Sequence, residues 1–293
     1  MERRGLYTII AVFFGLFIVF FGVTFIALSA SGGLGESGEA VGVVEISGAI
    51  MESKTAVKQL RAFSKDESIR AIVVRVDSPG GAVAPSQEIF DAVRKAKKEK
   101  PLVVSMGSTA ASGGYYIACG ADTIYANSGT VTGSIGVITQ LFNVSRILET
   151  AQVDVSTFTT GEYKNSGSPF SPVTDRDRQY FQQLIDDIYE QFVEDVAECR
   201  GLEVGAVREV ADGRVFTGRQ AHELKLVDEL GTFQDAVDFV AKEAKIEGDP
   251  RLVYPAKEDG SVLSSLLSGS VNGLIKEAKD ATTPVVEYRF TGL

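Results

Sequence analysis

The regular alternation of short apolar strands and amphipathic helices along residues 41–138 is the feature that most limits how this chain can fold. The strand-like runs are rich in valine and isoleucine, as buried strands are. They lie at residues 41–46, 71–76, 102–104, 123–126 and 131–138, with helical stretches at 56–63, at 85–98 and directly after residue 112. Strands and helices that alternate at this spacing form βαβ units, so the sequence predicts an α/β fold with a largely parallel sheet.

Two glycine-rich turns follow neighbouring strands of this predicted sheet. The sequence DSPGG, residues 77–81, follows one strand, and Ser112-Gly113-Gly114 follows the next. Because ligands of parallel sheets bind at the carboxyl ends of the strands, we expect the two turns to face each other. A serine on such a strand-to-helix turn has an exposed hydroxyl, and the next backbone N–H points to where an oxyanion would develop. Ser112 is therefore a candidate nucleophile, with a helix N-cap as the alternative.

A serine nucleophile needs a base, and the chain has a single histidine, His222. His222 lies in a charged helical stretch and has no neighbour that would orient it, so a lysine is the better candidate. A lysine acts as a base only when its amine is neutral, which requires a pKa lowered from about 10.4 to roughly 7–8. Lys164 lies in a loop of Gly, Ser, Thr and Asn residues, although Glu162 stands two residues before it. Loop position alone leaves other lysines open.

Composition excludes several classes of protein. The chain has 293 residues, of which 44% are hydrophobic and 23% charged, so it can bury one sizeable core. A net charge of -10 argues against nucleic-acid binding, because phosphates require a basic surface. The two cysteines, Cys119 and Cys199, fit small buried apolar residues better than a disulfide or a metal site, and their disulfide state stays open.

The N-terminal region predicts a membrane anchor. Residues 6–30 contain no charge over 25 residues, and a spanning helix needs about 20. Arg3 and Arg4 precede this run, so residues 1–5 should be cytoplasmic and everything after residue 31 extracytoplasmic. The sequence thus predicts a single-pass protein of the cell membrane. A cleavable signal peptide is the alternative. Residues 31–40 form a polar, glycine-rich tether.

The second half of the chain continues the same domain to residue 248. We expect a strand at 153–159, a long amphipathic helix at 175–200, a turn and short helix at 213–224, and a helix at 233–244. Beyond it, residues 249–293 should form an amphipathic helix at 262–279 and an extended tail.

Four motifs together resemble the signal peptide peptidase A family of membrane-bound serine peptidases, in its short single-domain form. They are VDSPGG at 76–81, STAASGGYYIA at 108–118, TGSIGV at 132–137 and GEYKNSGSPF at 161–170. The resemblance covers residues 41–244 and implies the ClpP/crotonase spiral fold. It also implies that Ser112 is the nucleophile, Lys164 the general base and Ser134 the serine that orients the lysine.

The resemblance further implies an oxyanion hole made by the N–H of Gly113 and that of Gly80 or Gly81, with Gly80 favoured. No metal or cofactor is implied. The substrates would be remnant signal peptides and other unfolded hydrophobic segments, with small apolar side chains near the cut. The protomers would form a membrane-attached ring whose sites are shared between neighbours.

Two other classes remain open from the sequence. One is an acyl-CoA enzyme of the crotonase type, and the other is a non-catalytic membrane scaffold in which Ser112 only caps a helix. Neither the cleavage-site preference nor the number of subunits can be derived from the residues.

Overall fold

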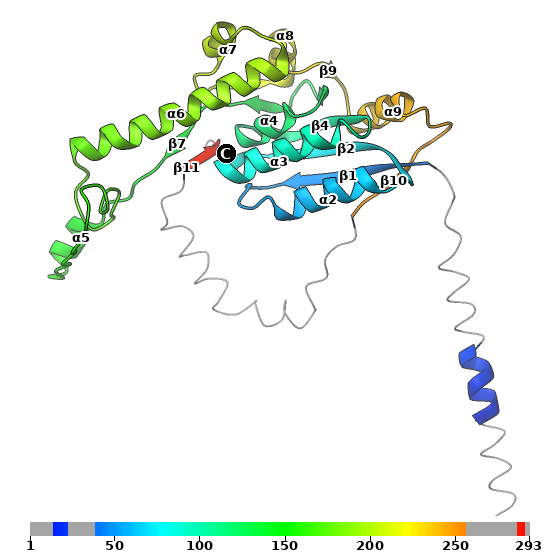
Figure 1. Cartoon of the computed structure of the whole chain (residues 1–293), viewed down its shortest axis with the longest axis horizontal. Helices are drawn as coiled ribbons and strands as arrows, with labels where there is room; N and C mark the ends of the chain where they lie inside the picture. The colour runs from blue at the N-terminus through cyan, green and yellow to red at the C-terminus, as the bar shows by residue number, and fades with distance from the viewer. Residues whose placement is uncertain (1–13, 23–38, 256–285, 291–293) are drawn as a thin grey trace, which may run out of the picture. The chain divides into compact units, whose positions relative to one another are not determined.

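The computed structural model describes residues 14–22, 39–255 and 286–290, and the chain divides into two units, Met1–Gly38 and Glu39–Leu293 (Figure 1). In the first unit, residues 14–22 form a helix with exposed side chains. The remainder of the predicted anchor at 6–30 and nearly all of the tether lie outside the described residues. Within the described part, no helix is both long and apolar enough to cross a membrane.

The second unit is built on a largely parallel sheet, as predicted. Its centre consists of β1 (Ala40–Ser47), β2 (Ile69–Ser78), β4 (Leu102–Ala111) and β5 (Thr123–Ala126), all parallel. Two short strands, β10 (Arg251–Val253) and β9 (Glu229–Leu230), extend it at either edge. The end of β4 also pairs with β6 (Val131–Gly133), and β6 pairs antiparallel with β8 (Val215–Thr217).

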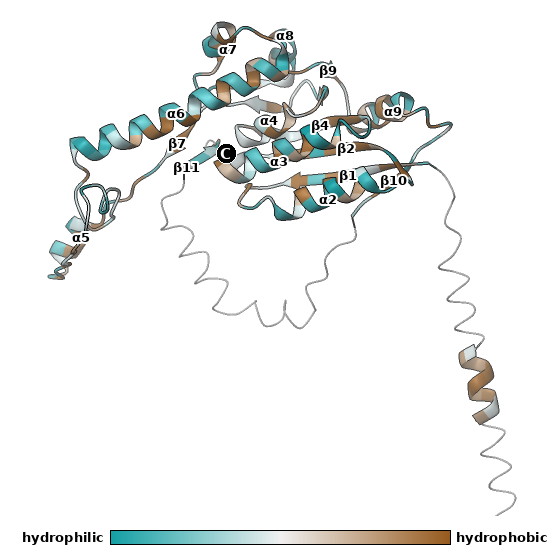
Figure 2. Cartoon of the chain, in the orientation of Figure 1, coloured by the Kyte–Doolittle hydropathy of each residue, from teal (hydrophilic) through white to brown (hydrophobic). Residues whose placement is uncertain are grey.

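Helices cover both faces of this sheet, which explains why its strands read as continuous apolar runs. On one face lie α2 (Lys54–Lys65), α3 (Val83–Ala96) and α4 (Gly113–Ala118), packed on side chains such as Val44 and Val74. On the other lies α9 (Phe233–Glu243), packed on Val73 and Val103. Successive residues of a strand therefore face different cores. Figure 2 shows the apolar central strands between helices of mixed hydropathy.

A second, smaller sheet brings the end of the chain back to the domain. In it β11 (Val286–Arg289) lies antiparallel between β3 (Gly80–Ala82) and β7 (Ile138–Thr139). The domain therefore extends beyond residue 248, because β10 and β11 are both paired with it. The extended conformation expected for the tail is present, but its Tyr288 is fully buried. The helix expected at 262–279 lies outside the described residues.

The long helix α6 (Asp175–Arg200) has the bounds that the sequence predicts. A capping box between Thr174 and Asp177 begins it, and Gly201, with a φ of 61°, ends it. It is followed by α7 (Val204–Val210) and α8 (Gly218–Glu223), and preceded by α5 (Ser145–Thr150). The strand expected at 153–159 is wrong: this segment is irregular and exposed. A strand needs a hydrogen-bonded neighbour, and no sheet edge lies beside this segment in the chain as described.

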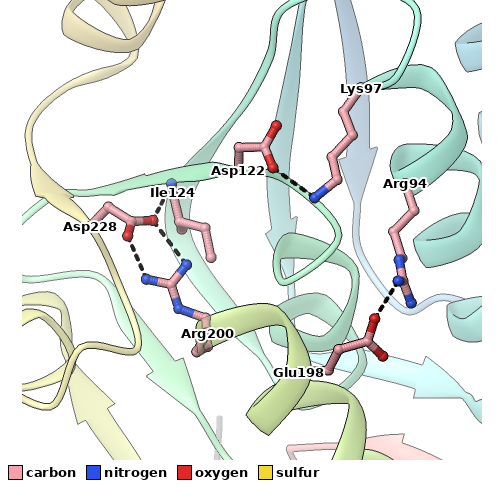
Figure 3. A network of polar contacts seen from close by, with 7 residues as sticks. All are labelled: Arg94, Lys97, Asp122, Ile124, Glu198, Arg200 and Asp228. Atoms are coloured by element: carbon pink, nitrogen blue, oxygen red, sulfur yellow. Dashed lines mark hydrogen bonds and ion pairs between the residues drawn. The ribbon is translucent and has the colours of Figure 1, made fainter. Parts of the chain in front are cut away.

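A partly buried ion pair fastens the C-terminal end of α6 to the sheet (Figure 3). The Arg200 guanidinium donates to both carboxylate oxygens of Asp228, over 2.6 and 3.0 Å. The same carboxylate accepts the backbone N–H of Ile124 in β5 over 2.8 Å. The Arg200 side chain is 6% exposed and the Asp228 side chain 32%, so the arginine is buried while the carboxylate keeps some contact with water. One hydrogen-bonded cluster thus fixes α6 to β5.

Candidate active site

Ser112 lies at the turn between β4 and α4. Its N–H donates to the Gly133 carbonyl over 2.8 Å, and its side chain makes no capping hydrogen bond. The structure therefore gives no support to a capping role. We expected an exposed hydroxyl, but Ser112 is only 1% exposed in the single chain. The turn is enclosed because β6 pairs with the end of β4 and because Tyr288 of β11 lies against Gly113.

The backbone of Ser112 is strained. Its φ of 54° and ψ of -116° belong to a region that glycine adopts easily and residues with a side chain rarely do. Such a conformation costs on the order of 1–3 kcal/mol and persists only where the surroundings impose it. Here the hydrogen bond to Gly133 and the start of α4 impose it. Nucleophilic serines on sharp strand-to-helix turns have this property.

Gly80 and Gly113 lie against each other beside Ser112. A Cβ on Gly80 would lie 2.7 Å from the Gly113 nitrogen, and Gly80 has a φ of 98°, so only glycine suits this position. The Gly113 N–H is at the start of α4 and has no acceptor within the helix. The Gly80 N–H donates to the hydroxyl of Ser78 over 3.1 Å. Gly81 instead packs on Ile50, so Gly80 is the glycine that adjoins Gly113.

Ser134 is brought close to Ser112 through the β6 strand. It directly follows Gly133, whose carbonyl accepts the Ser112 N–H. Ser134 is 6% exposed and has a φ of 51°, and its own N–H donates to the Arg214 carbonyl over 2.8 Å. Two non-glycine residues with positive φ therefore meet where β4 and β6 end.

Lys164 is not brought to Ser112 within one chain. It is exposed, in the loop between α5 and α6. Figure 1 shows α5 and this loop at the end of α6 that lies away from α4. Glu162, the carboxylate nearest to Lys164 in the sequence, pairs with Arg176 over 2.6 Å.

The Lys164 loop is held to the start of α6 through Asp177. This carboxylate accepts the Ser166 hydroxyl over 2.5 Å and the Thr174 hydroxyl over 2.7 Å. The hydrogen bonds from Ser166 and Thr174 lower the pKa of Asp177 to about 2. The loop that carries Lys164 is thereby tied to an ionised, hydrogen-bonded carboxylate.

The other titratable candidates lie outside this arrangement. His222 is exposed on α8. Cys119 and Cys199 are free thiols, and burial raises the pKa of Cys119 to about 12. Among the described residues, no cluster of three or more His, Cys, Asp or Glu side chains could hold a metal ion.

Two residues of the site were not identified in the sequence. Ser78 is fully buried and accepts the Gly80 N–H, and Tyr288 presents its carbonyl to Gly80 and Gly113. The only local signal for Tyr288 is the alternation of Val, Glu, Tyr, Arg and Phe at 286–290, which is typical of a strand. The assembled site is a strained serine beside two closely packed glycines, an arrangement suited to acyl transfer through an oxyanion.

Comparison with known families gives two matches. The model of peptidase family S49 matches residues 94–247, which include Ser112, Ser134 and Lys164. The Clp protease model matches residues 42–130, the part that forms β1 to β5. The predicted ClpP-like α/β fold with its largely parallel sheet is therefore confirmed.

Known sequences and a solved structure are similar to this chain. A Synechocystis protein assigned as a protease is 42% identical over 228 residues, which are 77% of this chain and 82% of that protein. An Enterococcus faecium protein assigned as signal peptide peptidase SppA is 36% identical over 233 residues, 78% of this chain and 67% of that protein. Among solved structures, a ClpP1 variant from Listeria monocytogenes has a TM-score of 0.46 at 17% identity, covering 66% of this chain and 93% of that chain.

Proposed function

The chain belongs to peptidase family S49, and from this membership we propose that it is a membrane-anchored serine endopeptidase with a Ser112–Lys164 dyad. The observation that carries the proposal is the strained Ser112 turn, packed beside Gly80 and Gly113. The substrates are cleaved signal peptides and other unfolded hydrophobic segments. A span at residues 6–30 places the peptidase domain on the extracytoplasmic side of the cell membrane.

The reaction proceeds by acyl transfer. The neutral amine of Lys164 takes the proton from Ser112 as the hydroxyl oxygen attacks the scissile carbonyl. The N–H groups of Gly113 and Gly80 hold the resulting oxyanion, which replaces the Ser78 hydroxyl as the acceptor for Gly80. Lys164 then protonates the leaving amine, and water repeats the cycle on the acyl-enzyme. Ser134 hydrogen-bonds the lysine and orients it.

The lysine of each site comes from a neighbouring copy of the chain in a ring. Two observations support this step. Figure 1 shows that the loop between α5 and α6, which carries Lys164, lies away from α4, the helix that begins directly after Ser112. The segment 140–174 also exposes large apolar side chains that a partner would cover. The most exposed of these are Phe142 at 66%, Ile147 at 67% and Phe158 at 94%.

Subunit mixing tests the whole proposal. Ser112→Ala and Lys164→Ala should each abolish cleavage of a hydrophobic peptide. When the two inactive proteins are unfolded, mixed in equal amounts and refolded together, about a quarter of the sites should pair an intact serine with an intact lysine. Activity should return to a similar fraction of wild type. His222→Ala is the control and should remain active throughout.

The possible failures of this experiment are distinct. An active Ser112→Ala protein would exclude the serine as nucleophile. Two inactive variants that recover nothing on mixing would place both residues of the dyad in one subunit and would remove the shared site.

A further inference from the structure

We infer that Arg176 is a positioning residue for the proposed general base: it holds the Glu162 carboxylate away from the Lys164 amine and so extends the activity of this peptidase to lower pH. The inference rests on the proposed function and specifies its pH range. It starts from a conflict in the sequence, where a carboxylate stands two residues before a lysine that must be neutral in order to act.

Glu162 is the charge in this loop that works against a neutral lysine. A carboxylate within about 4–6 Å of an amine favours the ammonium form, so the amine loses its proton only at a higher pH. Glu162 and Lys164 lie on one tight turn, in which the Lys164 N–H donates to the Gly161 carbonyl over 3.4 Å. Both side chains are exposed in the single chain, so the partner that each one binds decides whether they meet.

The partner of Glu162 is Arg176, on the first turn of α6. The Arg176 guanidinium donates to the Glu162 carboxylate over 2.6 Å. Lys164, in contrast, makes no ion pair with any residue that the structure describes. The side chains of the pair are 44% and 68% exposed, and an ion pair as exposed as this adds little to stability. Its consequence is local, because it places a positive charge on the carboxylate beside the base.

Arg176 also contacts the residue that directly precedes Lys164. Its guanidinium lies over the ring of Tyr163, 5.2 Å from the centroid. The same ring packs on Tyr180, one turn later on α6, with the ring centroids 5.2 Å apart. One arginine therefore contacts both residues before Lys164, and it fixes the turn at the same time as it binds the carboxylate.

The other charges around the loop are bound elsewhere. Asp177 accepts hydroxyl groups from two residues, and Asp175 and Arg178 lie 4.0 Å from each other on α6. Residues 141–144, which also pack on the loop, carry no charge. Glu162 is thus the carboxylate of this region whose position Arg176 decides.

The site that Lys164 enters in a neighbouring copy has its charges paired as well. The Ser134 N–H donates to the Arg214 carbonyl, and the guanidinium of Arg214 binds the Asp212 carboxylate over 2.7 Å. Ser112 and the two glycines beside it are uncharged. The electrostatic balance at the Lys164 amine therefore depends on the pair of Glu162 and Arg176.

The pH dependence of kcat/KM tests this role on the full-length protein, because it reports the ionisation of the free enzyme. In Arg176→Gln the released Glu162 carboxylate can reach the amine. The midpoint at which activity rises should then move to higher pH by about 0.3–1 unit, and high salt should reduce this shift. Below both midpoints, such a shift is a loss of about two- to tenfold in kcat/KM.

Three further variants identify the cause of the shift. Glu162→Gln added to Arg176→Gln should return the midpoint to the wild-type value, because the carboxylate is gone. Arg176→Lys keeps the charge but not the planar group over Tyr163, so it should keep the midpoint even where it lowers the maximal rate. Arg178→Gln removes an exposed arginine two residues further along α6 and is the matched control, with an unchanged midpoint.

The outcomes that contradict the inference are specific. If Arg176→Gln lowers the maximal rate and leaves the midpoint in place, Arg176 only supports the fold of the loop. If the midpoint stays shifted in the double variant, Glu162 is not the cause, and the inference fails in this case too. Failure of the proposed function is a separate result, because Lys164→Ala would then remain active.

Discussion

At the scale of single residues, Ser112 is both the candidate nucleophile and a residue with a strained backbone. Its φ of 54° is imposed by the hydrogen bond to Gly133 and by the start of α4. The side chain therefore stays in a conformation that it would avoid elsewhere. The strain has a cost in stability, and the Ser112 hydroxyl makes no capping hydrogen bond that would offset it.

Replacing Ser112 should separate stability from activity. Ser112→Gly and Ser112→Ala both remove the proposed nucleophile, but only glycine adopts this backbone without strain. We expect Ser112→Gly to be more stable than Ser112→Ala by about 1 kcal/mol, after allowing for the greater flexibility of glycine in the unfolded chain. Urea unfolding of both variants measures the difference. A more stable alanine variant would show that the strain is absent in solution.

The proposed role of Lys164 gives a second residue-scale prediction. Lys164→Arg should be as inactive as Lys164→Ala, because a guanidinium is effectively never deprotonated. Because a lysine base works only as the neutral amine, wild-type activity should rise across about pH 6 to 10. His222→Ala should keep both the rate and the profile. An inactive His222→Ala beside a working Lys164→Ala would overturn the dyad.

The site residues that could be predicted are those that follow predicted strands. Gly80 and Ser112 stand where two parallel strands end, and the topology of such sheets brings those ends together. Tyr288 could not be predicted in the same way, since its partners in β3 and β7 are about 150–200 positions earlier in the chain. Pairing at that separation leaves no local periodicity to detect.

At the scale of elements, α6 and α9 begin with the same motif and so provide a matched pair. Thr174 with Asp177 and Thr232 with Asp235 both form capping boxes. Only Asp177 also accepts a hydroxyl from the preceding loop, that of Ser166. The carboxylate of α6 therefore orders the Lys164 loop as well as the helix.

Alanine substitutions should distinguish these two roles. Asp177→Ala and Asp235→Ala should each weaken a helix start, but only Asp177→Ala should speed amide exchange in residues 161–170 and lower activity. Because the folded pKa of Asp177 is lowered to about 2 from its usual value of 3.8, its contribution to stability is full above pH 3.8 and is lost as the pH falls towards 2. Hydrogen exchange of residues 161–170, measured at pH 7 and at acidic pH, tests the role of Asp177 in the loop and the pH dependence of that role. Equal exchange of the loop in the two variants would contradict the assignment.

The elements differ in how far local pattern determined them. The bounds of α6 could be predicted because a helix satisfies its own backbone and shows its 3.6-residue period. The segment 153–159 alternates like a strand, but its neighbours in space decide whether it pairs, and it pairs with none of the strands that the structure describes. Its exposed apolar side chains, among them Phe158, are consistent with coverage by another copy.

At the scale of the whole molecule, the catalytic unit is closed by segments from its two ends. The first strand, β1, pairs with β10, and β3 at the site pairs with β11. The sequence boundary at residue 248 missed this closure because β10 and β11 have only three and four residues. Strands this short carry almost no periodic signal.

The ion pair between Arg200 and Asp228 fixes α6 to the sheet at its C-terminal end. Near this fixed end, the helix buries the side chains of Phe192, Val193 and Val196. In its first half only Asp177 is buried. At 1.5 Å per residue, the 26 residues of α6 span about 39 Å. A rotation of α6 by about 5° about its C-terminal end would displace its N-terminal end by about 3 Å, more than a proton transfer tolerates. If the site is shared between subunits as proposed, the stiffness of α6 at Arg200 limits how accurately one subunit can place its lysine in the next.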